Sequence, residues 1–218
     1  CADPRKVHVV PFGANLEQAP TPEQAAAWRA ERPTDVCRLL FIGTNWERKG
    51  GPLAAAAAEA LERQGRHVEL AIAGCRPTGP LPACATVYGY ISKHTPAGRD
   101  LLQRLYARSH FLLLPTRNEA FGLVLAEACA YGVPCLASAI GGIPTIIEAG
   151  GNGCLFPPAA GAEAYAAAIG RLLDDPPRYQ AMSLAAVQAY QARLNWPAAG
   201  QRAAQLLAQA AAGSLSAG

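Results

Sequence analysis

Two glutamates lie eight positions apart in the stretch NEAFGLVLAEA, which runs from Asn118 to Ala128. The residues around them are mostly apolar, as in a helix that packs on a core, and acids are seldom fully buried without partners. Glu119 and Glu127 therefore have to reach solvent or a ligand. If one helix spans both, its rise separates them by about 12 Å. That spacing suits two groups of hydroxyls on either side of a diphosphate, as in a nucleotide sugar.

A second group of candidates lies in the stretch FIGTNWERKGG, where Arg48 and Lys49 come directly before Gly50 and Gly51. Glycine lets the backbone approach a ligand closely. The helix expected to follow presents free N–H groups, which favour an anion. Two cations at such a place suit a phosphate or a diphosphate. The alternative is a solvated turn with two exposed cations.

The stretch PTRNEAFG, residues 115–122, leads from a strand into the helix with the two glutamates. The amides of Ala120, Phe121 and Gly122 are expected in the first turn, where helical N–H groups lack partners. They could hold an anion or the hydroxyls of a sugar. Alternatively, Glu119 is only a cap of this helix.

Several classes of ligand are excluded or disfavoured. GxGxxG is absent after the first strand and GxxxxGK[ST] is absent throughout, which argues against a dinucleotide and against a P-loop. A net charge of +3 without a basic run gives no support for nucleic acid. The seven cysteines form no CxxC and no metal-binding spacing, so we expect reduced thiols in a cytoplasmic protein and no bound metal.

Apolar runs alternate with helical patterns along most of the chain, and the runs are apolar along their whole length. This is typical of a parallel sheet covered on both faces, so we predict a doubly wound, Rossmann-like α/β domain. Its ligand crevice should lie at the carboxyl ends of the strands. The predicted strands are 38–43, 68–74, 85–90, 110–115, 133–138 and one within 152–158, and the predicted helices are 51–65, 97–109, 121–132, a short one at 145–150 and most of 160–213.

The two ends of the chain differ from this pattern. KVHVVPFG, residues 6–13, is β-branched and predicts a strand, and residues 14–37 predict a linker with a short helix. The sequence starts with Cys1 rather than Met and shows no signal peptide, so we expect it to begin inside a longer protein. The predicted units are a linker region at 1–37, the doubly wound domain at 38–195, and a terminal helix and tail at 196–218.

Several segments together resemble one family. EAFGLVLAE resembles the E-x7-E motif of the retaining GT-B glycosyltransferases of group 1, or family 4. LLFIGTNWERKGG is similar to the start of their C-terminal, donor-binding domain, and GVPCLASAIGGIP and GNGCLFPP are similar to the segments that follow the motif. KVHVVPFGAN and NWPAAGQRAAQLL resemble their interdomain segment and terminal helix. The resemblance covers nearly the whole chain.

The resemblance implies roles for individual residues. Lys49 and Arg48 would neutralise the leaving diphosphate and Glu119 would lie near the donor sugar, which makes these three the catalytic candidates. Glu127 would bind the ribose. The remaining substrate-binding candidates are Gly43, Thr44, Tyr90, Ile91, Ala120, Phe121, Gly122 and Leu123, with Tyr90 and Ile91 against the nucleobase. Thr44 stands where the family often has a basic residue, which weakens the cation assignment, and Thr145 stands where the family often has a glutamate.

The implied activity is transfer of a sugar from a UDP-, GDP- or ADP-sugar to an acceptor hydroxyl with retention, without a metal or other cofactor. The acceptor, a saccharide, lipid or small molecule, would bind mainly to an N-terminal domain that this sequence lacks. Any membrane association would also belong to that domain, and the fragment alone would bind nucleotide without turnover. Two alternatives stay open: a sugar-nucleotide epimerase with this fold, and a non-catalytic nucleotide-binding module.

Overall fold

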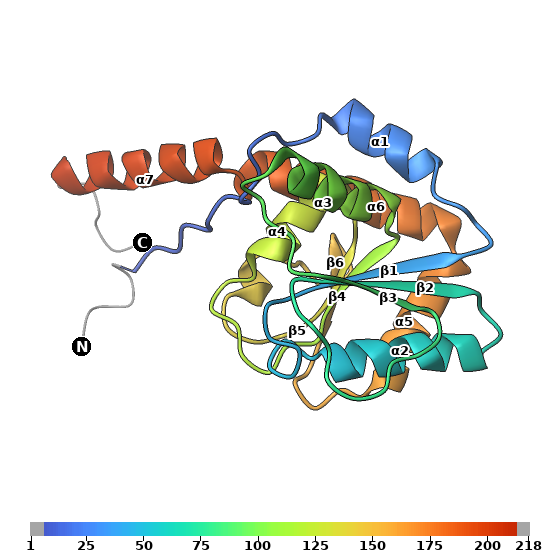
Figure 1. Cartoon of the computed structure of the whole chain (residues 1–218). Helices are drawn as coiled ribbons and strands as arrows, with labels where there is room; N and C mark the ends of the chain where they lie inside the picture. Colours follow the sequence, from blue (N-terminus) through green and yellow to red (C-terminus); the bar gives the residue numbers. More distant parts are fainter. Residues whose placement is uncertain (1–6, 213–218) are drawn as a thin grey trace.

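The computed structural model describes residues 7–212 and contains one six-stranded, all-parallel sheet (Figure 1). Its strand order is β3-β2-β1-β4-β5-β6. The strands are β1 (Cys37–Ile42), β2 (Val68–Ala73), β3 (Ala85–Gly89), β4 (Phe111–Leu114), β5 (Cys135–Ser138) and β6 (Gly153–Phe156). The predicted doubly wound α/β fold is therefore confirmed.

Helices cover both faces of this sheet (Figure 1). On one face α2 packs against α5, and on the other face α3 and α4 lie on the sheet, with α1 and α6 packed behind them. The helices are α1 (Pro22–Ala30), α2 (Gly51–Arg63), α3 (Pro96–Arg108), α4 (Leu123–Ala130), α5 (Ala162–Leu173), α6 (Pro176–Arg193) and α7 (Trp196–Ala211). Helix α7 projects away from the sheet, to the left in Figure 1.

The burial of the central strands explains their sequences. Every residue of β4 and β5 is buried, so both strands are apolar without alternation. Phe41 and Leu113 point to the face with α2 and α5, whereas Leu40 and Leu112 point to the face with α3 and α4. Two apolar layers therefore enclose the sheet, and chemistry is left to the loops at its edges.

The strand order reverses between β1 and β4. These strands are hydrogen-bonded neighbours, with Leu39 opposite Phe111, although the β2 and β3 units separate them in the sequence. In such sheets a crevice opens at the carboxyl ends of the two strands where the order reverses. The loops 43–50 and 115–122 start at those two ends, so the fold brings the two predicted ligand loops together.

Three local predictions were wrong. The helix predicted from residue 121 begins at Leu123, because Gly122 has a left-handed backbone with φ of 97°. Residues 7–13 form no strand in the structure, since among the described residues this exposed segment has no pairing partner; Lys6 lies outside the described residues. The predicted helix 145–150 is replaced by one 3-10 turn, Ile143–Thr145.

No helix within residues 7–212 combines the length and the apolar composition that a membrane crossing requires. Six of the cysteines lie in the described part of the chain, and all six are free thiols. Cys1 lies outside it.

Candidate functional site

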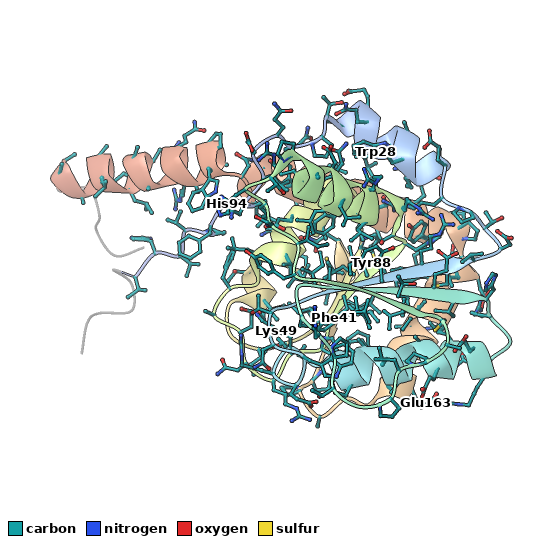
Figure 2. The ribbon with its side chains drawn as sticks, in the orientation of Figure 1. Trp28, Phe41, Lys49, Tyr88, His94 and Glu163 are labelled. Carbon is teal, nitrogen blue, oxygen red and sulfur yellow. The ribbon has the colours of Figure 1, made fainter. Side chains whose placement is uncertain are left out.

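The loop after β1 places Lys49 at the point where the strand order reverses. Gly50 has φ of 78°, and a Cβ there would come within 1.9 Å of the Pro115 carbonyl oxygen, so only glycine lets the two loops meet. The Lys49 stem crosses Gly43, where a Cβ would lie 2.9 Å from it. Figure 2 shows Lys49 at the edge of the sheet where β1 ends.

Lys49 and Glu119 form an ion pair across the two loops. The Lys49 ammonium donates to the Glu119 carboxylate, and their side chains are 15% and 9% exposed. Two loops that are 70 residues apart thus meet through one cation and one anion. A pair that is buried to this degree depends on its partners, because removal of either side chain leaves a charge with little solvent.

The glycine loop after β5 supports the residues that follow Glu119. The Gly142 N–H donates to the Ala120 carbonyl over 3.0 Å. A Cβ at Gly141 would lie 1.8 Å from the Glu119 carbonyl oxygen, and Gly141 has φ of 55°. Because Gly141 and Gly142 have no side chains, the loop after β5 can contact the backbone between Glu119 and Phe121 directly.

The backbone amides around the start of α4 point to no acceptor within the described part of the chain. Within residues 7–212, the N–H groups of Ala120, Phe121, Gly122, Leu123 and Val124 make no hydrogen bond. Ala120 and Leu123 are exposed, so a ligand can reach this end of the helix. Unpaired amides at a helix start, together with the helix dipole, favour an anion.

The start of α2 offers less than the sequence predicted. The Gly51 N–H donates to the Trp46 carbonyl over 2.8 Å, and Pro52 has no N–H, so the expected free amides are largely absent. Trp46 is buried beneath this turn and contacts Phe41 edge to face, with ring centroids 5.3 Å apart. Trp46 is thus a packing residue of the loop.

Arg48 and Thr44 are both exposed beside Lys49. The Arg48 guanidinium donates to the Asn118 carbonyl over 3.1 Å, and its own carbonyl accepts from the Arg117 N–H and the Thr116 hydroxyl. Arg48 thus joins the two loops that Lys49 and Glu119 also join.

Glu127 lies in a separate setting from Glu119. Its carboxylate is buried, with one oxygen paired with the Lys93 ammonium and the other accepting from the Tyr106 hydroxyl over 2.8 Å. The expected separation of about 12 Å from Glu119 assumed helix throughout. Because α4 begins at Leu123, helical rise covers only the four residues up to Glu127, about 6 Å.

A cavity of about 440 Å³ adjoins Glu127. This volume is within the range of small-molecule pockets, roughly 300–1,000 Å³. The linker residues 15–18, the start of α3, and Lys93, Tyr106 and Tyr131 line it, whereas Lys49 and Glu119 do not. Tyr90 and Ile91 are not in its lining either; Tyr90 is 74% exposed, and Ile91 packs partly buried against the core beneath α3 and α4.

The comparison with protein families decides the identity of the domain. The family described as "Glycosyl transferases group 1" matches residues 37–175, from the first strand to the end of α5. The chain belongs to the group 1 glycosyltransferases.

Relatives of this glycosyltransferase domain are about twice as long as the chain. The D-inositol 3-phosphate glycosyltransferase of Thermobispora bispora is 33% identical over 223 residues, which cover 96% of this chain and 52% of that protein. The solved sucrose-phosphate synthase of Thermosynechococcus elongatus is 28% identical with a TM-score of 0.70, over 95% of this chain and 53% of its own. The chain thus spans about half the length of the curated relatives it matches, and its fold is one half of a GT-B fold.

A further solved structure shares the fold at lower identity. Anabaena Alr3699/HepE, solved in complex with UDP-glucose, is 19% identical with a TM-score of 0.67 and is matched over 91% of this chain and 56% of its own. The recognised family and the fold class are therefore confirmed, whereas the roles of individual residues stay predictions.

The sequence analysis of this glycosyltransferase domain missed Lys93 and Tyr106. Lys93 stands in the loop after β3, where a single cation looks like a solvated residue. Tyr106 matches the apolar face of α3 and is buried, as a core residue would be. Their partner Glu127 is 34 and 21 residues away, so no local pattern links them.

Burial and the nearby Glu127 charge raise the pKa of Tyr106 well above its ordinary value. Tyr106 is therefore a hydroxyl donor over the whole physiological range of pH. Burial also raises the pKa of Cys37 to about 12, so this thiol is not a thiolate at neutral pH.

The histidines of the glycosyltransferase domain have different surroundings. The His110 ring accepts from the Arg38 N–H at Nδ1 and donates to the Pro33 carbonyl at Nε2, as expected of a structural histidine. His94 is among the residues that line the cavity beside Glu127. It lies just before α3, where Figure 2 labels it. His8 and His67 are exposed.

Proposed function

We propose that this domain binds the nucleoside diphosphate sugar from which a retaining glycosyltransferase takes its sugar. The observation that carries the proposal is the Lys49–Glu119 pair, which stands where the strand order reverses, beside five backbone amides that have no partner among residues 7–212. A cation and a helix start favour a diphosphate, and a carboxylate accepts hydrogen bonds from sugar hydroxyls. Alr3699/HepE, which shares the fold, binds UDP-glucose.

Each predicted residue has a role in this proposal. Lys49 leaves Glu119 and turns to the diphosphate, with Arg48, Gly43 and Thr44 around it. Glu119 then accepts from the sugar, and the amides from Ala120 to Leu123 donate to phosphate and sugar oxygens. Glu127 binds the ribose in the adjoining cavity, and the base packs on the loop with Tyr90 and Ile91.

The chemistry follows from where charge develops. As the bond between the anomeric carbon and the phosphate oxygen breaks, the sugar gains oxocarbenium character and the diphosphate gains negative charge. The amides around the start of α4 are fixed donors that face this charge, and Lys49, once it has turned to the diphosphate, adds a cation; both lower the barrier. The acceptor hydroxyl attacks from the face of the leaving group and gives its proton to the departing phosphate.

The acceptor is assigned to the half of the full-length protein outside this chain, because the chain matches only 52% of its relatives' length. The isolated chain should therefore bind nucleotide but transfer no sugar. Calorimetry with UDP, GDP and ADP tests the first statement, and no binding at millimolar concentration of any of them would refute the proposal. Sugar transfer by the chain alone would refute the second statement.

A further inference from the structure

Both oxygens of the buried Glu127 carboxylate are already held by the protein. Lys93 pairs with Oε1, and the Tyr106 hydroxyl donates to Oε2 over 2.8 Å. The two donors come from different places, the loop after β3 and the last turn of α3. A carboxylate that is held at both oxygens has little rotational freedom, so its direction is fixed before any ligand arrives.

The hydrogen-bond acceptor positions that remain free on this carboxylate match a pair of neighbouring hydroxyls. An ionised carboxylate accepts at about four lone-pair positions, two on each oxygen. Lys93 and Tyr106 each occupy one, so each oxygen keeps one free. Two parallel acceptors on one rigid group suit two neighbouring hydroxyls, as in the vicinal diol of a ribose.

We infer that Lys93 and Tyr106 are positioning residues, which fix Glu127 so that it reads both ribose hydroxyls and discriminates against 2′-deoxyribonucleotides. This inference rests on the proposed function. The inference adds Lys93 and Tyr106 to the donor site, together with a selectivity for ribose over 2′-deoxyribose. Neither follows from the E-x7-E motif alone.

The surroundings of Tyr106 make it a rigid support. Its ring stacks on Tyr131 with centroids 5.1 Å apart, and Tyr131 stacks in turn on Trp28 at 5.7 Å. Tyr106 is buried, so its hydroxyl depends on Glu127 as an acceptor. The stack ties the direction of the carboxylate to the packing of α1, α3 and α4.

Lys93 also contacts the linker before α1 and the helix α3. The Lys93 ammonium also donates to the Asn15 carbonyl over 3.4 Å. The backbone carbonyl of Lys93 accepts from the Arg99 guanidinium over 3.1 Å. Arg99 pairs with Glu17 over 3.0 Å. The cation is therefore fixed at the mouth of the cavity beside Glu127 and offsets the cost of burying that carboxylate.

The test compares ribonucleotides with 2′-deoxyribonucleotides on the 218-residue chain by calorimetry. The probe is the best-binding pair among UDP and 2′-deoxy-UDP, GDP and 2′-deoxy-GDP, and ADP and 2′-deoxy-ADP. We expect the ribonucleotide to bind about tenfold more tightly, as one hydrogen bond to a charged group contributes. In Tyr106→Phe and in Lys93→Met the ratio should fall to about twofold or less, mainly through weaker ribonucleotide binding.

Two further variants separate positioning from stability. Lys93→Arg keeps the cation and should restore most of the ratio. Tyr179→Phe is the matched control, because this hydroxyl also binds a charged side chain, Arg32, but lies at the opposite edge of the sheet. It should leave the ratio unchanged. Thermal melting identifies any variant that has lost its fold.

The outcomes distinguish the inference from the proposed function. Equal loss of both nucleotides in Tyr106→Phe and Lys93→Met would mean a merely structural role and would overturn the inference. Equal binding of the ribo and deoxy forms by the unchanged chain would also overturn it, while the donor site would stand. If the unchanged chain binds no nucleotide, the proposed function fails and the inference fails with it.

Discussion

Glu127 and Lys93 meet in an ion pair whose two members differ in exposure: the glutamate side chain is 2% exposed and the lysine side chain 37%. The Lys49–Glu119 pair gives the first glutamate of the motif a lysine of its own. Each carboxylate is thus neutralised before a ligand binds. A donor molecule has to compete with a lysine at one site and to share the carboxylate with a lysine at the other.

Replacement of Lys49 should weaken the binding of diphosphates selectively. In Lys49→Met we expect the affinity for the best-binding nucleoside diphosphate to fall about 10- to 100-fold, since a hydrogen bond to a charged group contributes roughly 1.5–3 kcal/mol. Affinity for the corresponding nucleoside should change by less than about twofold. Calorimetric titrations with both ligands measure the difference.

Lys49→Met also leaves the Glu119 carboxylate without its partner, and a control has to separate the effect of that unpaired charge. The double variant Lys49→Met/Glu119→Gln removes that charge and should show the same loss for the diphosphate. Arg63→Met removes a cation from an exposed pair with Glu163 on the surface of α2 and α5, and should have no effect. Parallel losses for nucleoside and diphosphate would argue against a phosphate role for Lys49.

Alanine at Gly141 should disturb the donor site, whereas alanine at Gly150 should not. Both glycines have positive φ, so either change carries a backbone cost of about 1–2 kcal/mol. Only at Gly141 does the new Cβ also meet a backbone atom, the Glu119 carbonyl oxygen; at Gly150 it meets nothing within 4 Å. Gly141→Ala should lose a further 1–3 kcal/mol, roughly, in urea unfolding, together with several-fold nucleotide affinity. Similar results for the two variants would contradict this account.

Acid should destabilise the domain through His110. Burial, aided by the nearby Arg32 charge, lowers the pKa of His110 to about 4 from its ordinary value of 6.5. The unfolded chain therefore binds the proton first as pH falls. The stabilisation is complete above about pH 6.5 and is lost down to about pH 4, with a total near 3 kcal/mol.

The measurement is the free energy of unfolding in urea at pH values from 7 to 4. His110→Gln should flatten the dependence, and His67→Gln, at an exposed position, should leave it as it is. The same slope in the unchanged chain and in His110→Gln would assign the acid sensitivity to other groups.

Loss of Arg32 should destabilise the fold without affecting nucleotide selectivity. This buried guanidinium donates to the carbonyls of Ala107, Tyr131 and Gly132 and to the Tyr179 hydroxyl, and so joins the end of α1 to three helices. Arg32→Met removes the donor to the Ala107 and Tyr131 carbonyls, whereas Gly132 keeps its bond from Ser183, and the cost should be about 2–4 kcal/mol in urea unfolding. A change below about 0.5 kcal/mol, as expected for the exposed Arg63→Met, would show that water replaces the guanidinium.

The sequence predicted the fold well where one physical cause dominates. HFLLLP is apolar throughout because β4 is buried on both faces, and that pattern indicates a parallel sheet. The β-branched segment 6–13 shows the limit of the same reasoning. Strand propensity was present, but among the described residues no strand pairs with residues 7–13, and Phe12 packs instead on Phe121 and Trp196.

The site was predicted less completely. Lys49 and Glu119 follow from loop chemistry at two strand ends, and the structure brings them together. The start of α4 was misplaced by two residues, because FGLVLAEA does not reveal that Gly122 is left-handed. Lys93 and Tyr106 could not be predicted from a local pattern, since their importance comes only from long-range contact with a buried acid.

The reversal of strand order between β1 and β4 has a practical consequence for protein engineering. The side chains proposed to hold the diphosphate lie in the loops at the carboxyl ends of β1 and β4, whereas the proposed ribose contact, Glu127, is held by Tyr106 inside one of the apolar layers. Recognition of the diphosphate is therefore largely separable from folding, and recognition of the ribose is not. A library that varies residues 90–92 and keeps Lys93 would sample preferences for different bases without disturbing the carboxylate of Glu127.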